Sequence, residues 1–289
     1  MVLVPERFAA ERIRKSGAAG RRWVSELPAL VERLAARWQV SLAAEPAQYG
    51  DLALVVFGSV LGQPCVLKVS WSEHSTYDEV AALRAWNGHG AVRLLEASPD
   101  DGAVLLERLD AARSLEKLPL LSAAEIAGGV IRRLTVPAPP GIRAPREDVP
   151  LGERQAELGS PVPRRWVDQA SELLVALQAS SGRSLVHTDL HYGNILGAER
   201  EPWLAIDPRP VAGDPELSVP ELMWWRLDLD ARPAAIRTLL DTLVAAGSLD
   251  PDKALGWTIV RAVSYWLWGL QTGLTIDPAR CERLLEALA

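Results

Sequence analysis

Patterns typical of strands and patterns typical of helices occupy different parts of this chain. Across residues 39–70, short apolar runs are separated by Tyr49-Gly50-Asp51 and Leu61-Gly62-Gln63-Pro64, which predicts three antiparallel strands joined by tight turns. A helix at 76–87 and further strands follow, and the pattern is mostly helical from Leu109 onward. Segregated elements of this kind indicate an α+β fold, and the lack of an internal repeat excludes solenoids and propellers.

The predicted elements divide the chain into a sheet-containing lobe at 1–107 and a larger helical lobe at 108–289. Before the first strands, Ser25 and Pro28 are typical of the start of a helix, which we expect at 25–38. Thr76, with Glu79 three residues later, has the pattern of a capping box. The remaining expected elements are strands at 91–95, 104–107, 185–187, 195–196 and 203–206, and helices near 231–246, 254–271 and 278–288. Seven prolines make 134–163 a long connection.

The composition limits which binding partners and which cellular compartment we expect. The 289 residues are 48% hydrophobic and 24% charged, as in globular proteins, and the net charge of −6 argues against nucleic acid as a partner. The longest apolar runs, 52–57 and 263–270, are too short to span a membrane, and we expect no export signal because the first residues lack a long apolar stretch. The only cysteines, Cys65 and Cys281, do not form a disulfide framework. We therefore expect a cytoplasmic protein; the composition does not indicate an oligomeric state.

The densest group of reactive side chains runs from His187 to Asn194 and is followed by Asp207 at the end of an apolar strand. Phosphoryl transfer needs a carboxylate to orient the attacking hydroxyl and accept its proton, which Asp189 can do. It also needs hard oxygen ligands for Mg²⁺, and Asn194 and Asp207 carry such oxygens. Asp and Asn also favour ordinary turns, but this combination and spacing favour catalysis.

Lys68 lies in an expected strand, and Glu79 lies on the expected helix that follows. A lysine on the donor phosphates, held by a carboxylate, is the other requirement of phosphoryl transfer. Glu79 shares a helix face with Leu83 and Trp86, so it should point toward the sheet. Otherwise Lys68 is a surface lysine, Glu79 only closes its capping box, and Asp78 is the substitute carboxylate.

These motifs resemble the aminoglycoside and hydroxyurea resistance phosphotransferases, particularly the streptomycin 6-kinase branch. The resemblance extends over nearly the whole chain and is carried most strongly by the sequences at 186–196 and 204–208. Weaker similarity lies at 106–110, 133–141 and 213–215.

The resemblance implies a two-lobed protein-kinase-like fold that binds ATP and Mg²⁺, with the nucleotide between the lobes. In such a fold Asp189 is the catalytic base and Asn194 and Asp207 bind magnesium. The nucleotide would be bound by Lys68 with its partner Glu79, and by the backbone at Glu107 and Leu109.

Three positions depart from the family pattern or from protein kinases. Protein kinases cover the phosphates with G-x-G-x-x-G, whereas the corresponding turn, 43–51, has only Gly50. Thr188 stands where related resistance enzymes usually carry glycine. Pro208 follows Asp207, and its fixed φ argues against regulation by a flipping loop.

The expected substrate is a small cationic molecule, and streptomycin, with its guanidinium groups, fits best. From Asp207 to Asp230 the sequence contains six acidic residues and only two arginines. Among these acids, Asp214, Glu216 and Glu221 are candidate substrate ligands, since carboxylates bind guanidinium groups. Each of these acids could equally serve a local ion pair. Hydroxyurea is the alternative acceptor that the family suggests, and Trp224-Trp225 is expected in the core rather than on a sugar.

Other classes of protein fit the sequence less well. A zinc hydrolase could use His187, Asp189 and His191, but only His74 and His89 remain as further histidine ligands. A serine acyl-enzyme would have Ser114 and Lys117 as S-x-x-K but lacks K-T-G. A kinase-like binding protein with weak catalysis remains an alternative because of the single glycine in the phosphate-covering turn.

Overall fold

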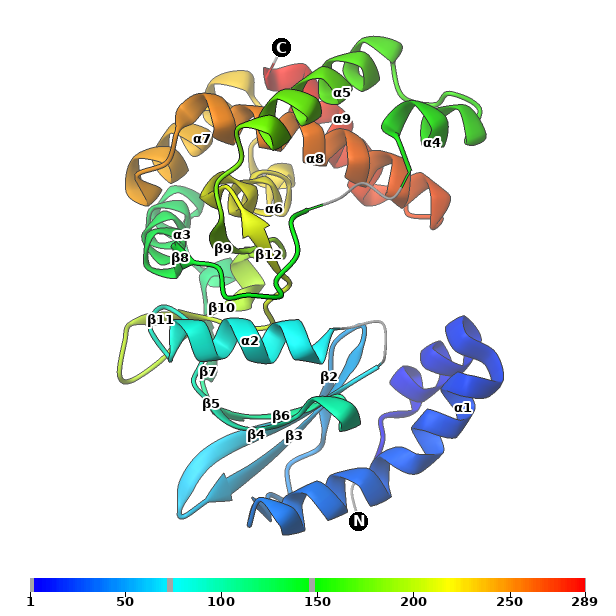
Figure 1. Cartoon of the computed structure of the whole chain (residues 1–289), viewed down its shortest axis with the longest axis vertical. Helices are drawn as coiled ribbons and strands as arrows, with labels where there is room; N and C mark the ends of the chain where they lie inside the picture. Colours follow the sequence, from blue (N-terminus) through cyan, green and yellow to red (C-terminus); the bar gives the residue numbers. More distant parts are fainter. Residues whose placement is uncertain (1–2, 72–74, 146–148, 289) are drawn as a thin grey trace. The chain divides into compact units, whose positions relative to one another are not determined.

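The computed structural model describes residues 3–71, 75–145 and 149–288 and divides into two compact units. The N-terminal unit contains residues 1–88 and 92–109, and the C-terminal unit contains 89–91 and 110–289. The first contains a six-stranded antiparallel sheet with two helices, and helices dominate the second, as the α+β prediction requires (Figure 1). His74, which the zinc hypothesis used, lies outside the described residues. No helix in the described ranges is long and apolar enough to cross a membrane.

An antiparallel sheet forms the centre of the N-terminal unit. Its order is β1-β3-β4-β6-β5, with β2 paired to β3. The strands are β1 (Ser41–Leu42), β2 (Gln48–Tyr49), β3 (Ala53–Val60), β4 (Gln63–Ser70), β5 (Leu94–Ser98) and β6 (Ala103–Glu107). The strand expected at 91–95 starts only at Leu94, because Ala91 belongs to the C-terminal unit and forms an isolated bridge with Ala205 of that same unit.

Helix α1 (Glu6–Arg37) is much longer than the helix expected at 25–38. Ser25 does not cap it, because its hydroxyl donates a hydrogen bond to the Arg22 carbonyl inside the helix. Pro28 is tolerated within the helix. The break in α1 lies instead at Gly17, whose φ of 57° and ψ of −130° are not helical.

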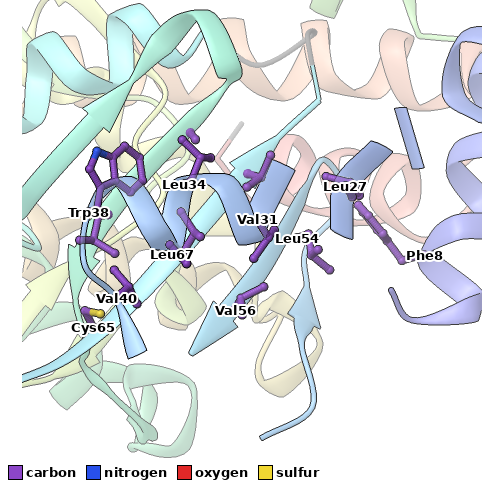
Figure 2. Packing of buried hydrophobic residues seen from close by; sticks show 14 residues of the cluster. Phe8, Leu27, Val31, Leu34, Trp38, Val40, Leu54, Val56, Cys65 and Leu67 are labelled. Carbon is purple, nitrogen blue, oxygen red and sulfur yellow. The ribbon is translucent and has the colours of Figure 1, made fainter. Parts of the chain in front are cut away.

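The later part of α1 packs on the sheet and forms the core of the N-terminal unit. Leu27, Val31 and Leu34 recur every three or four residues, so they share one helix face. In Figure 2 they lie over Leu54 and other strand side chains, and the cluster is almost completely buried. Burying each such side chain stabilises the fold by about 1.5–3 kcal/mol.

The N-cap of helix α2 (Thr76–Trp86) lies one residue earlier than the sequence predicts. The cap is Ser75, whose hydroxyl accepts a hydrogen bond from the Asp78 amide at 3.3 Å, so the capping box expected at Thr76 is wrong. The helix ends at Asn87, which adopts the left-handed conformation. With Ser75 as the N-cap, Glu79 is not needed to close a capping box with Thr76.

The C-terminal unit is a set of helices around α8, which contacts α5, α6 and α9. The helices are α3 (Leu120–Leu134), α4 (Leu151–Glu157), α5 (Arg164–Ala179), α6 (Val219–Trp224), α7 (Pro233–Gly247), α8 (Pro251–Gln271) and α9 (Ile276–Leu288), as Figure 1 shows. The three predicted C-terminal helices are therefore confirmed. Trp257 and Trp266 of α8 are buried as expected, whereas Trp268 is 44% exposed.

Two small antiparallel sheets interrupt these helices, in the orders β11-β10-β7 and β12-β9-β8. Their strands are β7 (Asp110–Ser114), β8 (Val136–Pro137), β9 (Ser184–His187), β10 (Ile195–Gly197), β11 (Trp203–Ala205) and β12 (Pro210–Gly213). The runs expected at 185–187, 195–196 and 203–206 are present. Strands β7, β8 and β12 were not predicted, because they are short and two of them contain proline.

Candidate active site

The loop that carries Asp189 follows strand β9 and is fixed by His187. The His187 side chain is fully buried, and its Nε2 lies 3.0 Å from the Ile206 carbonyl oxygen. Its Nδ1 accepts a hydrogen bond from the Asp189 amide at 3.2 Å, so the other nitrogen carries the proton and donates. One imidazole thereby ties the backbone of Asp189 to the residue that precedes Asp207.

The Asp189 side chain reaches the surface of the loop, and 28% of it is exposed. One of its carboxylate oxygens lies 3.2 Å from Nε of Arg209. Thr188 holds Arg209 in turn, because its amide and its hydroxyl both donate to the Arg209 carbonyl oxygen, at 3.1 and 2.9 Å. The Thr188 hydroxyl, which a glycine at this position would lack, therefore helps to place the Arg209 guanidinium beside Asp189.

Asn194 and Asp207 lie at the open end of the hairpin formed by β10 and β11. Ile195 pairs with Ala205, and the Ile206 amide donates to the Asn194 carbonyl at 2.9 Å, so the hairpin places Asp207 one residue beyond this contact. The Asn194 side-chain nitrogen donates to the Asp189 carbonyl at 2.9 Å, which leaves the amide oxygen Oδ1 as the atom suited to a cation.

The backbone of Asp207 has a φ of 53°, a conformation that L-residues rarely adopt. Such backbone conformations are concentrated at functional sites, where the surrounding structure holds them. A carboxylate and an amide oxygen at one hairpin end are the hard ligands that Mg²⁺ takes. The donor set therefore fits a magnesium ion bound together with phosphate oxygens.

The same geometry argues against the zinc hypothesis. Both ring nitrogens of His187 are used within the fold, and His191 Nδ1 accepts a hydrogen bond from the Gly193 amide at 3.1 Å. Within the ranges that the structure describes, no group of three or more His, Cys, Asp or Glu side chains could hold a metal ion.

His191 supports the loop through an aromatic contact that the sequence did not reveal. Its ring stacks on Trp225 with centroids 3.7 Å apart and planes 4° apart. Trp225 also donates from Nε1 to the Glu116 carboxylate at 2.6 Å. Burial, with a smaller contribution from the nearby His187, lowers the pKa of His191 to about 4, so the ring is neutral near pH 7. Trp225 therefore belongs to this loop support and not to the core expected for it.

Gly193 lies inside this support. A Cβ at this position would come within 3.0 Å of His191 Cε1 and 3.2 Å of the Glu116 carboxylate carbon. A side chain would therefore push the stacked ring away from the loop. Trp224, by contrast, is buried as expected and stacks on Tyr265.

Two of the three candidate substrate ligands serve the fold itself. Asp214 is 2% exposed and accepts hydrogen bonds from the Gly182 amide, Lys253 Nζ and Trp257 Nε1, at 2.8, 2.9 and 3.0 Å. Glu216 is 5% exposed and accepts from the Asp250 amide, just before α8, at 2.8 Å. These contacts account for both carboxylates as anchors of α8, so an argument for a cationic substrate depends on the third acid.

That acid, Glu221, lies in α6 and interacts electrostatically with Asp189. Its side chain is buried, and its Oε1 is 3.7 Å from Arg261 Nη2 of α8, too far for a hydrogen bond. Burial raises the pKa of Glu221 to about 8; Arg261 lowers it and the Asp189 charge raises it, both by less. Near pH 7 this carboxyl is mostly protonated.

In the N-terminal unit the expected ion pair between Lys68 and Glu79 is present. Lys68 Nζ donates to Glu79 Oε1 at 2.8 Å, and the two side chains are 7% and 0% exposed. Strand β4 supplies Lys68 between Val55 and Val104 of the neighbouring strands, and α2 supplies Glu79. Such a buried pair is weak evidence for stability, since two buried ions cost more to desolvate than an apolar pair.

Glu107 and Leu109 lie at the end of the N-terminal unit. Glu107 is the last residue of β6, and both its amide and its carboxylate bond to the Arg93 backbone, at 3.0 and 2.7 Å. Leu109 is the last residue of the unit. The segment is thus held at its start, and its contact with adenine stays a prediction.

Comparison with solved structures defines the class of fold. An aminoglycoside phosphotransferase APH(4)-Ia, solved with AMP-PNP and hygromycin B, superposes with a TM-score of 0.58 at 18% identity, over 89% of this chain and 98% of that one. The choline kinase LicA from Streptococcus pneumoniae gives a TM-score of 0.57 at 12% identity, over 90% and 97%. The fold is therefore that of the small-molecule kinases, a protein-kinase-like fold.

The sequence places the chain more narrowly. The model of the aminoglycoside/hydroxyurea antibiotic resistance kinase family matches residues 37–273, and the chain belongs to this family. It is 39% identical to a streptomycin 6-kinase of Streptomyces glaucescens, over 96% of this chain and 95% of that protein. It is also 37% identical to a hydroxyurea phosphotransferase of Kitasatospora aureofaciens, over 100% and 86%. The resemblance stated from the motifs is confirmed.

Proposed function

We propose that this protein transfers the γ-phosphoryl group of ATP to a hydroxyl group of streptomycin, at position 6. The observation that carries the proposal is the arrangement of Asp189, Asn194 and Asp207 around one hairpin and loop, in a chain 39% identical to a streptomycin 6-kinase. A second streptomycin 6-kinase, from Streptomyces griseus, is 37% identical over 99% of the chain. We also place the reaction in the cytoplasm, where the free Cys65 and Cys281 stay reduced.

In this proposal the N-terminal unit binds the nucleotide. Lys68, held by Glu79, contributes its positive charge to the α- and β-phosphates, and the backbone at Glu107 and Leu109 contacts adenine. The buried ion pair keeps the ammonium in one position, so little side-chain freedom is lost when ATP binds.

Asp189 acts on the acceptor. Its carboxylate accepts a hydrogen bond from the substrate hydroxyl and takes the proton as the hydroxyl oxygen bonds to the γ-phosphorus. The bond from that phosphorus to the β–γ bridging oxygen breaks, and ADP leaves with its electron pair. A magnesium ion on Asn194 and Asp207 would offset negative charge on the β- and γ-phosphates. Arg209, 3.2 Å from Asp189, keeps the carboxylate oriented between turnovers.

Glu221 is the acid that we propose for the substrate's cationic group. Its carboxyl interacts electrostatically with Asp189 and has no strong anion-stabilising hydrogen bond to an arginine or lysine in the described structure. A guanidinium group approaching it would favour the ionised form and form a bidentate pair.

A panel assay tests the function. The full chain is incubated with Mg·ATP and, separately, streptomycin, hydroxyurea, other aminoglycosides and simple sugars, and products are analysed for a phosphate mass increment. Phosphostreptomycin, with NMR placing the phosphate at the 6-hydroxyl, is the expected result. Phosphorylation of hydroxyurea instead would favour the second relative's activity, and ATP binding without transfer to any acceptor would favour a binding protein. An Asp189→Asn variant controls for contaminating kinases.

A further inference from the structure

The first segment of α1, residues 6–16, folds back on the rest of the helix. The reversal occurs at Gly17, where φ is 57° and ψ is −130°. The backbone of the two segments then comes so close that a Cβ on Gly20 would lie 2.6 Å from the Arg12 carbonyl oxygen. We call residues 6–16 the strap.

The strap is bound to the turn between β2 and β3 through two cationic side chains. Arg12 Nη2 donates to the Asp51 carbonyl oxygen at 2.7 Å, and Lys15 Nζ donates to the Asp51 carboxylate, also at 2.7 Å. The second bond raises the pKa of Lys15 above its usual value, so its charge is retained. Asp51 is thus held through both its backbone and its side chain.

Aromatic contacts add to this attachment. Phe8 of the strap lies 5.4 Å from Tyr49, the last residue of β2, and 5.9 Å from Trp23, measured between ring centroids. Figure 2 shows Phe8 beside Leu27, at the end of the buried cluster of the N-terminal unit. The strap therefore spans from the hydrophobic core to the β2–β3 turn.

Arg12 is the unusual member of these contacts. It is 1% exposed, its Nε and Nη1 make no hydrogen bond with any described residue, and its guanidinium lies 5.5 Å from the Trp71 ring centroid. A buried guanidinium with one hydrogen bond and one aromatic neighbour is costly, and an apolar side chain would fill the space at lower cost. Stability alone does not explain a charge at this position.

The turn that the strap holds connects β2 to β3, and β3 pairs with the strand that carries Lys68. In a protein-kinase-like fold this connection covers the nucleotide phosphates, commonly with three glycines, whereas this chain has only Gly50 here. We propose that Arg12 and Lys15 are positioning residues for ATP, which hold the β2–β3 turn in its nucleotide-binding conformation in place of a glycine-rich loop. The inference rests on the proposed ATP-dependent function.

The test uses variants that weaken the attachment of the turn to the strap. Lys15→Gln and Asp51→Asn change side chains that are 37% and 59% exposed, so both should fold. Arg12→Lys replaces the planar guanidinium group by an ammonium group and keeps the positive charge. We expect the Kd and KM for Mg·ATP to rise about 2- to 30-fold, measured by calorimetry and steady-state kinetics, with the KM for the acceptor unchanged.

Arg14→Gln is the matched control, since Arg14 lies on the same segment and is 72% exposed, 3.9 Å from Glu11. A double variant, Lys15→Glu with Asp51→Lys, should restore ATP affinity toward that of the wild type, which a loss of general stability would not. If the wild type binds ATP and all three single variants match Arg14→Gln, the inference about the strap is refuted. If the wild type itself does not bind ATP, the proposed function fails instead.

Discussion

Replacing Glu221 by glutamine should change how stability depends on pH. Glu221 of α6 is buried, and desolvation is the main reason why its pKa rises to about 8 from an ordinary value of 4.5. Between these two pH values the folded protein holds a proton that the unfolded chain has released. Because the folded state then binds more protons than the unfolded state, the free energy of unfolding falls as the pH rises through this window.

The size of the effect follows from the width of the window. Each pH unit between 4.5 and about 8 lowers the free energy of unfolding by about 1.4 kcal/mol for one proton. The wild type should therefore lose on the order of 5 kcal/mol through Glu221 by pH 9. Glutamine cannot ionise, so Glu221→Gln should lack this loss. The two proteins should be similarly stable near pH 5 and differ by several kcal/mol at pH 9, with the variant more stable.

Urea unfolding followed by tryptophan fluorescence at a series of pH values from 5 to 9 measures this difference. All other titrating groups are shared by the two proteins and cancel in the comparison. Glu282→Gln, on the exposed side of α9, shows what loss of a surface carboxylate alone produces. Parallel stability curves for Glu221→Gln and the wild type would mean that Glu221 is already ionised in the fold, paired with Arg261, and the argument from desolvation would be refuted.

The other predictions concern catalysis. Asp189→Ala should lower kcat by about 10²–10⁴-fold or more while the calorimetric Kd for Mg·ATP stays near that of the wild type, since a proton acceptor is lost and no phosphate contact; an equal loss of ATP affinity would contradict the assignment. Asp207→Ala should weaken ATP binding with magnesium present and change it little in EDTA; the same loss in both conditions would remove Asp207 from the metal site. Trp225→Ala should lower kcat more than Trp225→Phe, because phenylalanine keeps the stack on His191 and loses only the hydrogen bond to Glu116. If both variants are as active as the wild type, the contact between Trp225 and His191 does not order the loop.

The parts of the site that could be predicted are those whose geometry is set by neighbours in sequence. Asn194 and Asp207 are brought together by a short hairpin, and the apolar runs that form it are visible at 195–196 and 203–206. Lys68 and Glu79 are separated by eleven residues, and the face of one helix was enough to aim Glu79 at the sheet. In both cases the contact follows from the periodicity of a helix or strand and from a short connection along the chain.

The support of the loop was missed because its partners are distant. Trp225 and Glu116 are 109 residues apart, and neither position has a local pattern that indicates the other. The start of α1 was missed for a different reason. A serine three residues before a proline has the same sequence pattern at a helix start and inside a helix whose apolar face is buried, and the packing of Leu27 and Val31 favours the second outcome.

The acidic segment shows why counting charges could not identify the substrate ligands. Asp214, Glu216 and Glu221 lie within eight residues and look alike as a source of negative potential. In the fold the first two already accept hydrogen bonds, Asp214 from Lys253 and Trp257 and Glu216 from the backbone before α8. Glu221 is buried near Asp189 without a hydrogen-bonded cation, and burial keeps its carboxyl mostly protonated at neutral pH, with a pKa of about 8. Selectivity for a guanidinium would then come from the desolvated state of one carboxyl, which depends on tertiary packing, and not from the net charge of the segment.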